Sequence, residues 1–219
     1  MATLARRSYF VTPNETALFL SQAPECQGRV QSMGNGVDAA FFVPNPLRLN
    51  PFEAGEQAVV FTGAMDYWPN IDGVSWFAAD VLPLLRTRWP LARFYIVGRS
   101  PSSQVQALAG AHVVVTGTVP DVRPYLQYAS AVVAPLRVAR GVQNKILEAM
   151  AMQQPVVTGS SCAYAIGATV GQGLLRADTP EEFVEALKPL LESPYNAAAL
   201  GQQARRYVEQ DSSRQAQLS

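Results

Sequence analysis

The sequence predicts an α/β fold in which a doubly wound parallel sheet is covered by helices on both faces. Three observations predict it. Short apolar runs recur from about residue 57 onwards, and several of them end in Gly. Amphipathic segments with apolar residues at helical spacing separate these runs. With 219 residues, 48% hydrophobic and 16% charged, the chain is long and apolar enough to bury a full core. Strands that alternate with helices imply a parallel sheet.

The predicted strands are short runs of β-branched and other apolar residues. Runs without polar alternation are typical of strands that are buried on both faces. They occupy residues 57–63, 93–98, 112–117, 131–135, 155–160 and 173–177.

The predicted helices lie between these strands. Pro69 opens the first one, because Pro is favoured at the first helical position. Its apolar residues fall at helical spacing: Val74, Phe77, Val81, Leu84 and Leu85. A short helix is expected to begin near Pro101, and a helical turn or two is expected at residues 122–129. The segment NKILEAMAM predicts a strong helix at residues 144–152.

Two more helices are predicted near the C-terminus. Thr179 is expected to cap the segment PEEFVEALKPLLES, because Thr is a favoured N-cap and Pro follows it at the first helical position. Glu181 and Glu182 add negative charge to the first turn, where the helix dipole favours it. A last helix is expected at residues 197–209.

The N-terminal part follows a different pattern. The segment SYFVTPNETALFL predicts one strand and the start of one helix, with Thr12, Asn14 and Glu15 near its cap. The following residues are rich in Gly, Asn and Pro, as is typical of an interdomain connector. Because one strand and one helix cannot close a domain, we expect residues 1–45 to be the end of an N-terminal domain plus the connector. Residues 46–219 are expected to form the C-terminal domain of a larger protein.

Composition excludes several classes of function. The 17 basic and 17 acidic residues balance, which argues against a dedicated binder of nucleic acid or membrane surfaces. No apolar run approaches the roughly 20 residues of a membrane span, and no signal peptide is recognisable. Cys26 and Cys162 are isolated, which suggests neither a disulfide framework nor a metal site. We therefore expect a cytoplasmic protein without a metal.

Positive charge is concentrated in the middle of the chain. Between Arg86 and Leu147, eight basic residues face one acidic residue, Asp121. Such a stretch suits a compact ligand with two phosphates. We expect three of the basic residues to solvate a helix end and its loop: Arg86, Arg88 and Arg93. The others that follow strands or open a helix are better ligand candidates: Arg99, Arg137, Arg140 and Lys145.

A ligand site is expected along the carboxyl ends of the strands, where doubly wound sheets bind their ligands. Three of these ends begin with Gly, which lets a ligand approach the backbone closely: Gly63, Gly98 and Gly117.

Four segments resemble a known family: FTGAMDYWPN, FYIVGRSP, VTGTVPDVRPYL and APLRVARGVQNKILEAMAMQQPVVTGS. In matching order they resemble the retaining glycosyltransferases of family four, and among these the sugar transferases of bacterial exopolysaccharide and PEP-CTERM export systems. Residues 35–42, NGVDAAFF, resemble the junction between the two Rossmann-like domains of the GT-B fold. The resemblance covers residues 9–210 and implies that the chain is the C-terminal, donor-binding half of such an enzyme.

The family pattern implies a role for Glu148, which would accept hydrogen bonds from the ribose hydroxyls of the donor nucleotide. The alternative is an ordinary glutamate on a helix surface. Many members carry another Glu eight positions earlier, where it contacts the transferred sugar; this sequence has Arg140 there. A guanidinium cannot accept a hydroxyl proton but can bind phosphate bidentately, so Arg140 is expected to face the diphosphate or a carboxylated sugar.

The resemblance also implies a diphosphate site at the start of the helix at 144–152. Free N–H groups near Gly141, Val142 and Asn144 would point at the diphosphate, and Lys145 would reach the departing phosphate. The alternative for Lys145 is a solvated lysine of the first turn. Most members carry an Arg and a Lys after the first strand, whereas this sequence has no base in the loop that begins at Gly63. Arg140 and Lys145 are expected to take their place as the catalytic cations.

The remaining donor contacts are expected in the loops after the second and third strands. Gly117 to Val119 correspond to the family's segment that lines the nucleobase, mainly through the backbone. Arg99 is expected near the base or the phosphates, with a surface loop residue as the alternative.

Together these residues predict transfer of a sugar from a UDP- or GDP-sugar to a glycan or lipid-linked acceptor, with retention. The sequence has no Asp-x-Asp pair, and neither a metal nor a cofactor is expected. The acceptor is expected to bind an N-terminal domain, so this chain alone should bind donor without turning it over. Peripheral association with the inner membrane is expected of the full-length protein only.

Three rival functions stay open. A dinucleotide-dependent oxidoreductase would need G-x-G-x-x-G after the first strand, where Gly63 stands alone until Gly73. A second is a non-catalytic nucleotide-binding module, in which Arg140 marks the loss of donor chemistry. The third is a nucleotide-sugar epimerase of the same two-domain architecture.

Overall fold

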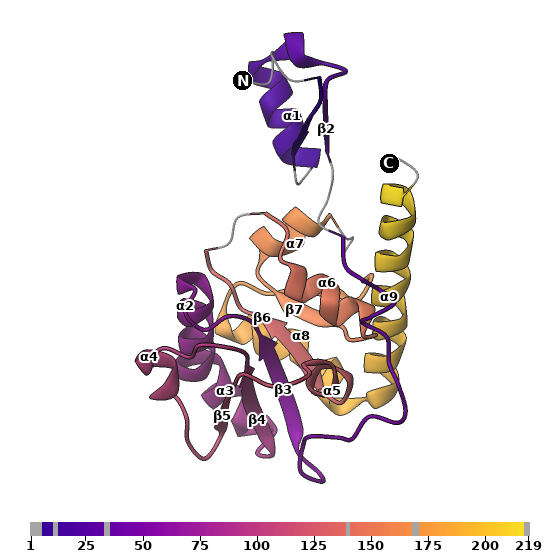
Figure 1. Cartoon of the computed structure of the whole chain (residues 1–219). Coiled ribbons are helices and arrows are strands. Elements are labelled where there is room, and N and C mark those ends of the chain that lie inside the picture. Colours follow the sequence, from indigo (N-terminus) through magenta and orange to yellow (C-terminus); the bar gives the residue numbers. More distant parts are fainter. Residues whose placement is uncertain (1–5, 11–12, 33–35, 139–140, 168–170, 217–219) are drawn as a thin grey trace.

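A six-stranded parallel sheet forms the centre of the molecule (Figure 1). The computed structural model describes residues 6–10, 13–32, 36–138, 141–167 and 171–216. Its strands, in the spatial order β5-β4-β3-β6-β7-β8, are β3 (Gln57–Thr62), β4 (Ala92–Val97), β5 (Val113–Gly117), β6 (Ala131–Ala134), β7 (Val156–Thr158) and β8 (Leu174–Arg176). From β3 at the centre of the sheet, the chain adds β4 and β5 on one side. It then returns to the centre with β6 and adds β7 and β8 on the other side. The predicted doubly wound fold is confirmed, with its topological switch point between β3 and β6.

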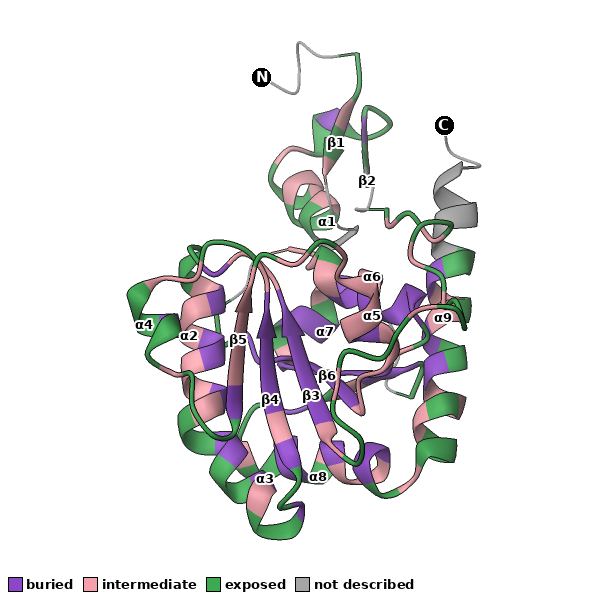
Figure 2. Ribbon diagram, turned by 60° about the horizontal axis from the view of Figure 1, so that its bottom comes forward, coloured by how far each residue is buried: buried purple, intermediate pink, exposed green. Residues whose placement is uncertain are grey.

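Helices cover both faces of this sheet. Because successive side chains of a strand point to opposite faces, the nearly complete burial of β3, β4 and β6 requires cover on each side (Figure 2). The α-helices that follow β3 in the chain are α2 (Trp68–Trp76), α3 (Leu82–Arg88), α4 (Ser103–Gln106), α5 (Arg123–Gln127), α6 (Asn144–Ala151), α7 (Ser160–Ile166), α8 (Pro180–Glu192) and α9 (Pro194–Ala216). The ring of Phe77, which lies between α2 and α3, contacts the rings of Phe94 in β4 and Phe183 in α8.

The first predicted helix has a wider turn in its middle. Between α2 and α3, residues Phe77–Val81 form the π-helical segment η2. A π turn holds more residues than an α turn and rotates the following residues about the axis. Leu82 is therefore buried, while Leu84, which we expected on the apolar face, is 39% exposed. The expectation for Leu84 was wrong because regular α-helical spacing does not continue through this segment.

The C-terminal helices confirm the predicted cap and extend beyond the prediction. Thr179 accepts a hydrogen bond from the amide of Glu182, and the Glu182 side chain accepts one from the amide of Thr179, a reciprocal capping box. Helix α9 begins before residue 197 and continues past residue 209. Helix α7 follows β7 directly and was not predicted, because the segment SSCAYAI is short and has no side-chain cap.

The N-terminal residues form a small unit of their own, separate from the six-stranded sheet (Figure 1). Strand β1 (Ser8–Phe10) pairs in parallel with β2 (Val30–Ser32), and α1 (Pro13–Gln22) and the short 3-10 helix η1 (Pro24–Cys26) connect them. The sequence predicted one strand and one helix here, so β2 is an addition. Thr12, predicted near the helix cap, lies outside the described residues. The domain boundary after residue 45 stays a prediction.

Two backbones meet at the carboxyl ends of β3 and β4. A Cβ atom built on Gly98 would lie 1.7 Å from the carbonyl oxygen of Gly63. Replacing Gly98 with Ala is therefore expected to lower the free energy of unfolding by about 1–3 kcal/mol, because the two loops must separate. Urea denaturation measures the loss. The control is Gly110→Ala, since nothing lies within 4 Å of the Cβ built there; equal losses in both variants would contradict the expectation.

Candidate functional site

A cavity of about 370 Å³ opens at the carboxyl ends of β3 and β4, beside the topological switch point. It is lined by Thr62, Gly63, Val97, Gly98, Arg99, Thr118, Val119, Val122, Lys145 and Glu148. The structure thus brings together predicted site residues from the loops after three strands and from α6: Gly63, Arg99, Val119, Lys145 and Glu148. This is the place where doubly wound folds bind their ligands.

The two loops that contribute Gly63 and Arg99 to this cavity are joined through their backbones. The amide of Met65 donates a 2.8 Å hydrogen bond to the carbonyl oxygen of Arg99, which joins the loops after β3 and β4. A Cβ atom on Gly63 would lie 2.8 Å from Nδ2 of Asn70 and 3.0 Å from Nζ of Lys145. The lack of a side chain at Gly63 is what lets these two groups reach the end of the central strand.

Lys145 reaches from α6 to this strand end. Its ammonium donates a 2.5 Å hydrogen bond to Oδ1 of Asn70 and lies 4.4 Å from the centre of the Phe61 ring. Burial disfavours the charged form and lowers the pKa of Lys145 to about 8, although the charges of Cys162 and Glu148 favour it. Within the described part of the chain, no carboxylate forms an ion pair with Lys145.

Asn70 contacts Lys145 beside this cavity and was not predicted as a site residue. The lining residues Thr62, Val97 and Val122 were not predicted either. The side chain of Asn70 is 3% exposed, and Nδ2 donates a 2.8 Å hydrogen bond to the carbonyl oxygen of Ala64. A signal was present in the sequence, because Asn70 follows Pro69 at the start of a helix that comes directly after the central strand. The apolar periodicity of that helix could not show that a polar residue of its first turn is buried.

Glu148 lies one turn after Lys145, on the side of α6 that faces the cavity. It is half-buried, and burial raises the pKa of its carboxyl group, while the charge of Lys145 lowers it. From the described residues, Glu148 receives no charge-stabilising hydrogen bond. The carboxylate is therefore placed to accept hydrogen bonds from hydroxyl groups of a ligand.

The other predicted donor-site residues lie beside the cavity and do not line it. Gly117 has a φ of 67° immediately before Thr118, and Gly141 has a φ of 70° before α6. Val142 packs against the core, and Asn144 is exposed as the first residue of α6. Among the described residues, no side chain caps this helix at its N-terminus. Arg140 lies outside the described residues, so its predicted role is untested.

The remaining basic residues of the central stretch are held by other protein groups. Arg137, an expected ligand candidate, instead pairs bidentately with Asp72, with N···O distances of 3.0 and 2.5 Å. Arg88 pairs with Glu185. Arg93 was expected to solvate a loop but pairs with Glu56, whose carboxylate also accepts a hydrogen bond from Tyr95. These contacts lower the pKa of Glu56 despite its burial.

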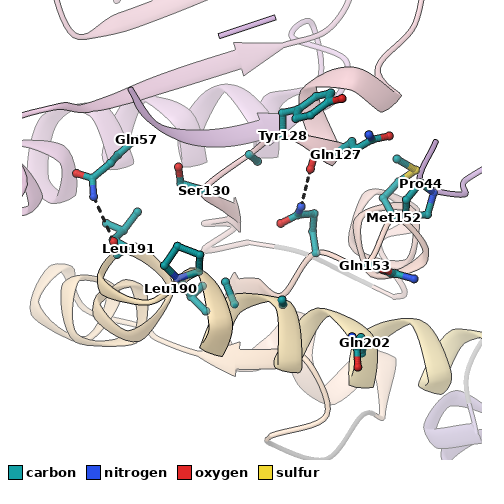
Figure 3. A pocket seen from close by; sticks show the side chains of 15 residues that line it. Pro44, Gln57, Gln127, Tyr128, Ser130, Met152, Gln153, Leu190, Leu191 and Gln202 are labelled. Carbon is teal, nitrogen blue, oxygen red and sulfur yellow. Dashed lines mark hydrogen bonds between the residues drawn. The ribbon is translucent and has the colours of Figure 1, made fainter. Parts of the chain in front are cut away.

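A larger cavity of about 500 Å³ lies at the opposite edge of the sheet, near the starts of β3, β6 and β7 (Figure 3). Of the described residues, those that line it include several glutamines and no charged side chain. Two of the amides connect structural elements, because Gln57 donates to the carbonyl oxygen of Leu191 and Gln154 donates to that of Gln127. A cavity without a cation does not suit a phosphorylated ligand. The cavity of about 370 Å³, which Lys145 and Glu148 line, is the candidate site.

The described residues contain neither a candidate metal site nor a helix that could cross a membrane. No group of three His, Cys, Asp or Glu side chains lies close enough together to hold a metal ion in that part of the chain. No helix there combines the length and the apolar character needed to cross a membrane.

Comparison with known families identifies the chain. The model of the family described as glycosyl transferases group 1 matches residues 56–193, which include the whole six-stranded sheet and the candidate site. The chain belongs to this family. A search of curated proteins finds no significant match.

Solved structures confirm the fold. The structure of Anabaena Alr3699/HepE in complex with UDP aligns with a TM-score of 0.73 and 16% identity, over 96% of this chain and 60% of that one. A glycosyltransferase from Rickettsia africae ESF-5 aligns with a TM-score of 0.76 and 12% identity, over 94% and 59%. Sucrose-phosphate synthase from Thermosynechococcus elongatus aligns with a TM-score of 0.72 and 19% identity, over 99% and 59%. This chain therefore spans about 60% of the length of these GT-B proteins.

The buried ammonium predicts a pH dependence of stability. The folded chain releases the proton of Lys145 near pH 8, whereas the unfolded chain keeps it until near its ordinary pKa of 10.5. Between these values the unfolded state binds more protons, so the free energy of unfolding rises with pH. We expect wild type to gain about 1 kcal/mol per pH unit relative to Lys145→Met over this range.

Guanidinium denaturation of both proteins between about pH 8 and about pH 10 measures this difference. Lys188→Met removes the other lysine of the chain, which lies in α8, and is the control for the loss of one positive charge. A difference between wild type and Lys145→Met that does not change with pH would contradict a desolvated ammonium.

Proposed function

We propose that this chain is the C-terminal, donor-binding half of a retaining glycosyltransferase that uses a nucleotide-diphosphate sugar. The observation that carries the proposal is the presence of two side chains of opposite charge on successive turns of α6. Lys145 and Glu148 line one cavity at the carboxyl ends of the strands, and neither is neutralised by a close ion pair within the described residues. A cation suits a phosphate, and a carboxylate suits the two adjacent hydroxyls of a ribose.

The other side of the cavity suits a nucleobase. Thr118, Val119 and Val122 present backbone groups and apolar surface after β5, and the exposed Arg99 lies at the rim. Gly117 precedes this wall. HepE was solved with UDP bound, which supports a nucleoside diphosphate as the ligand of this related fold. We propose UDP or GDP as the carrier of the sugar.

Catalysis would be mainly electrostatic. As the glycosidic bond opens, negative charge grows on the departing diphosphate, and fixed positive groups stabilise it. We assign this role to Lys145 and Arg140, together with the amides at Gly141, Val142 and Asn144 before and at the start of α6. In this proposal the reaction needs no metal ion and no cofactor.

The acceptor and the cellular role are further parts of the proposal. Because this chain covers about 60% of the HepE chain, we assign the acceptor, a glycan or a lipid-linked glycan, to the remaining N-terminal domain of a two-domain enzyme. The fragment alone would bind donor without transferring sugar. We place the full-length enzyme in exopolysaccharide or cell-surface polysaccharide synthesis, in the cytoplasm or at the inner face of the inner membrane.

Donor binding can be tested by thermal shift with UDP, GDP, ADP and NAD. A ligand at about 100 times its Kd adds roughly 2.7 kcal/mol of stability, which raises the Tm of a chain of this size by about 5–10 °C. We expect this shift with UDP or GDP for wild type and its loss in Glu148→Ala. Glu185→Ala, an exposed residue of α8, is the matched control. A shift with NAD alone would favour the oxidoreductase instead.

The full-length protein tests the chemistry. We expect sugar transfer from UDP- or GDP-sugar to continue in excess EDTA, and the anomeric configuration of the product, read by NMR, to match that of the donor. Arg140→Gln is expected to lower both donor affinity and turnover. Inversion at the anomeric carbon would contradict the proposed mechanism. Nucleotide binding without transfer would favour the non-catalytic module, and interconversion of nucleotide sugars would favour the epimerase.

A further inference from the structure

The partner of the Lys145 ammonium is a neutral amide. Oδ1 of Asn70 accepts its hydrogen bond over 2.5 Å, and both groups lie against Gly63 at the end of β3. Asn70 is almost fully buried in the first turn of α2. A buried polar residue in such a place requires hydrogen-bond partners, and this one has a partner at each end of its amide.

The orientation of the Asn70 amide is set by its other bond. Nδ2 donates to the carbonyl oxygen of Ala64, an atom that can only accept. A flipped amide would place two acceptors against each other, so Oδ1 faces Lys145. An ammonium has three N–H donors, and the bond to Asn70 uses one of them. The Lys145 side chain is thereby held in place while other donors remain for a ligand.

A neutral partner also leaves the charge of Lys145 uncompensated. Three titratable groups face it from the surrounding elements, which are Glu148 of α6, Cys162 of α7 and Arg99 after β4. Helix α2 contributes the uncharged Asn70. Glu148 acts on Lys145 through its charge, whereas burial raises the pKa of the Cys162 thiol, which carries a charge only as a thiolate. Within the described residues, no carboxylate lies within ion-pair distance of Lys145. An aspartate at position 70 would form such a pair and compete with a phosphate.

We propose that Asn70 is a positioning residue that holds the Lys145 ammonium at the end of β3 without neutralising it, so that its charge is available to the diphosphate of the donor. The proposal rests on the function proposed above. It assigns to α2 a part in phosphate binding that compensates for the absence of a basic residue in the loop after β3.

Binding measurements with paired ligands test this role. We expect Asn70→Asp to weaken the binding of UDP or GDP at least tenfold at pH 7. The affinity for uridine or guanosine is expected to stay unchanged, because a nucleoside carries no phosphate. Asn70→Ala, which adds no charge, is expected to weaken the binding of the diphosphate by a smaller factor. Asn196→Asp makes the same substitution at an exposed position of α9 and is expected to change neither affinity. Retained nucleoside binding shows that each variant is folded.

A second readout follows Lys145 itself. The chain has two lysines, so reductive methylation with ¹³C-formaldehyde gives two side-chain NMR signals, which Lys188→Arg assigns. We expect the Lys145 signal to titrate near pH 8 in wild type, at least one unit higher in Asn70→Asp, and no higher in Asn70→Ala. If Asn70 only stabilised the fold, Asn70→Asp and Asn70→Ala would affect the pKa of Lys145 alike. A rise in Asn70→Asp alone therefore indicates a direct role of position 70 beside the ammonium.

The outcomes separate the two proposals. If the wild type binds a diphosphate, but Asn70→Asp changes neither its affinity relative to the nucleoside nor the Lys145 titration, the role of Asn70 is overturned and the proposed function stands. If the wild type binds neither UDP nor GDP, the donor function is overturned and the phosphate role falls with it, whatever Lys145 does. A selective loss of diphosphate binding together with a raised Lys145 titration supports the role of Asn70.

Discussion

The candidate site depends on placing a positive charge in a poorly hydrated position at the end of the central strand. Burying an ammonium is costly unless hydrogen bonds and nearby π-electrons or charges offset the loss of water. Here Asn70 accepts a hydrogen bond, the Phe61 ring lies beneath the cation, and Glu148 lies one turn away. These partners come from α2, β3 and α6, so the position of the charge requires the whole switch point of the sheet to be assembled.

Small residues at the strand ends make this arrangement sterically feasible. Gly63 leaves room for the two polar side chains, and Gly98 lets the loop after β4 approach the loop after β3. The close contact of these loops also places Arg99 at the rim of the cavity. The same two glycines therefore serve sheet packing and site formation, and a change at either one affects both.

Much of the architecture could be predicted because its signals are local. Runs such as VVF and YIV predict buried strands wherever they occur, and Thr179, Pro180 and the two acidic residues after them predict a helix start from four consecutive residues. The exceptions have physical reasons. The wider turn at Phe77–Val81 breaks the regular helical spacing that placed Leu84 on the apolar face, and Leu84 is exposed. The pairing of Arg137 with Asp72 joins residues 65 positions apart, which no local pattern shows.

By itself, the sequence determined the doubly wound α/β class. It also predicted the edge of the sheet where a ligand is expected, and two of the predicted residues of α6, Lys145 and Glu148, line the cavity there. These follow from periodicity and from the resemblance of short segments, which depend on neighbours in the chain. Only the tertiary structure decided which cations are already paired and that Asn70 is the partner of Lys145. A hydrogen bond between side chains on two different helices depends on how those helices pack over the sheet, and that is a property of the whole core.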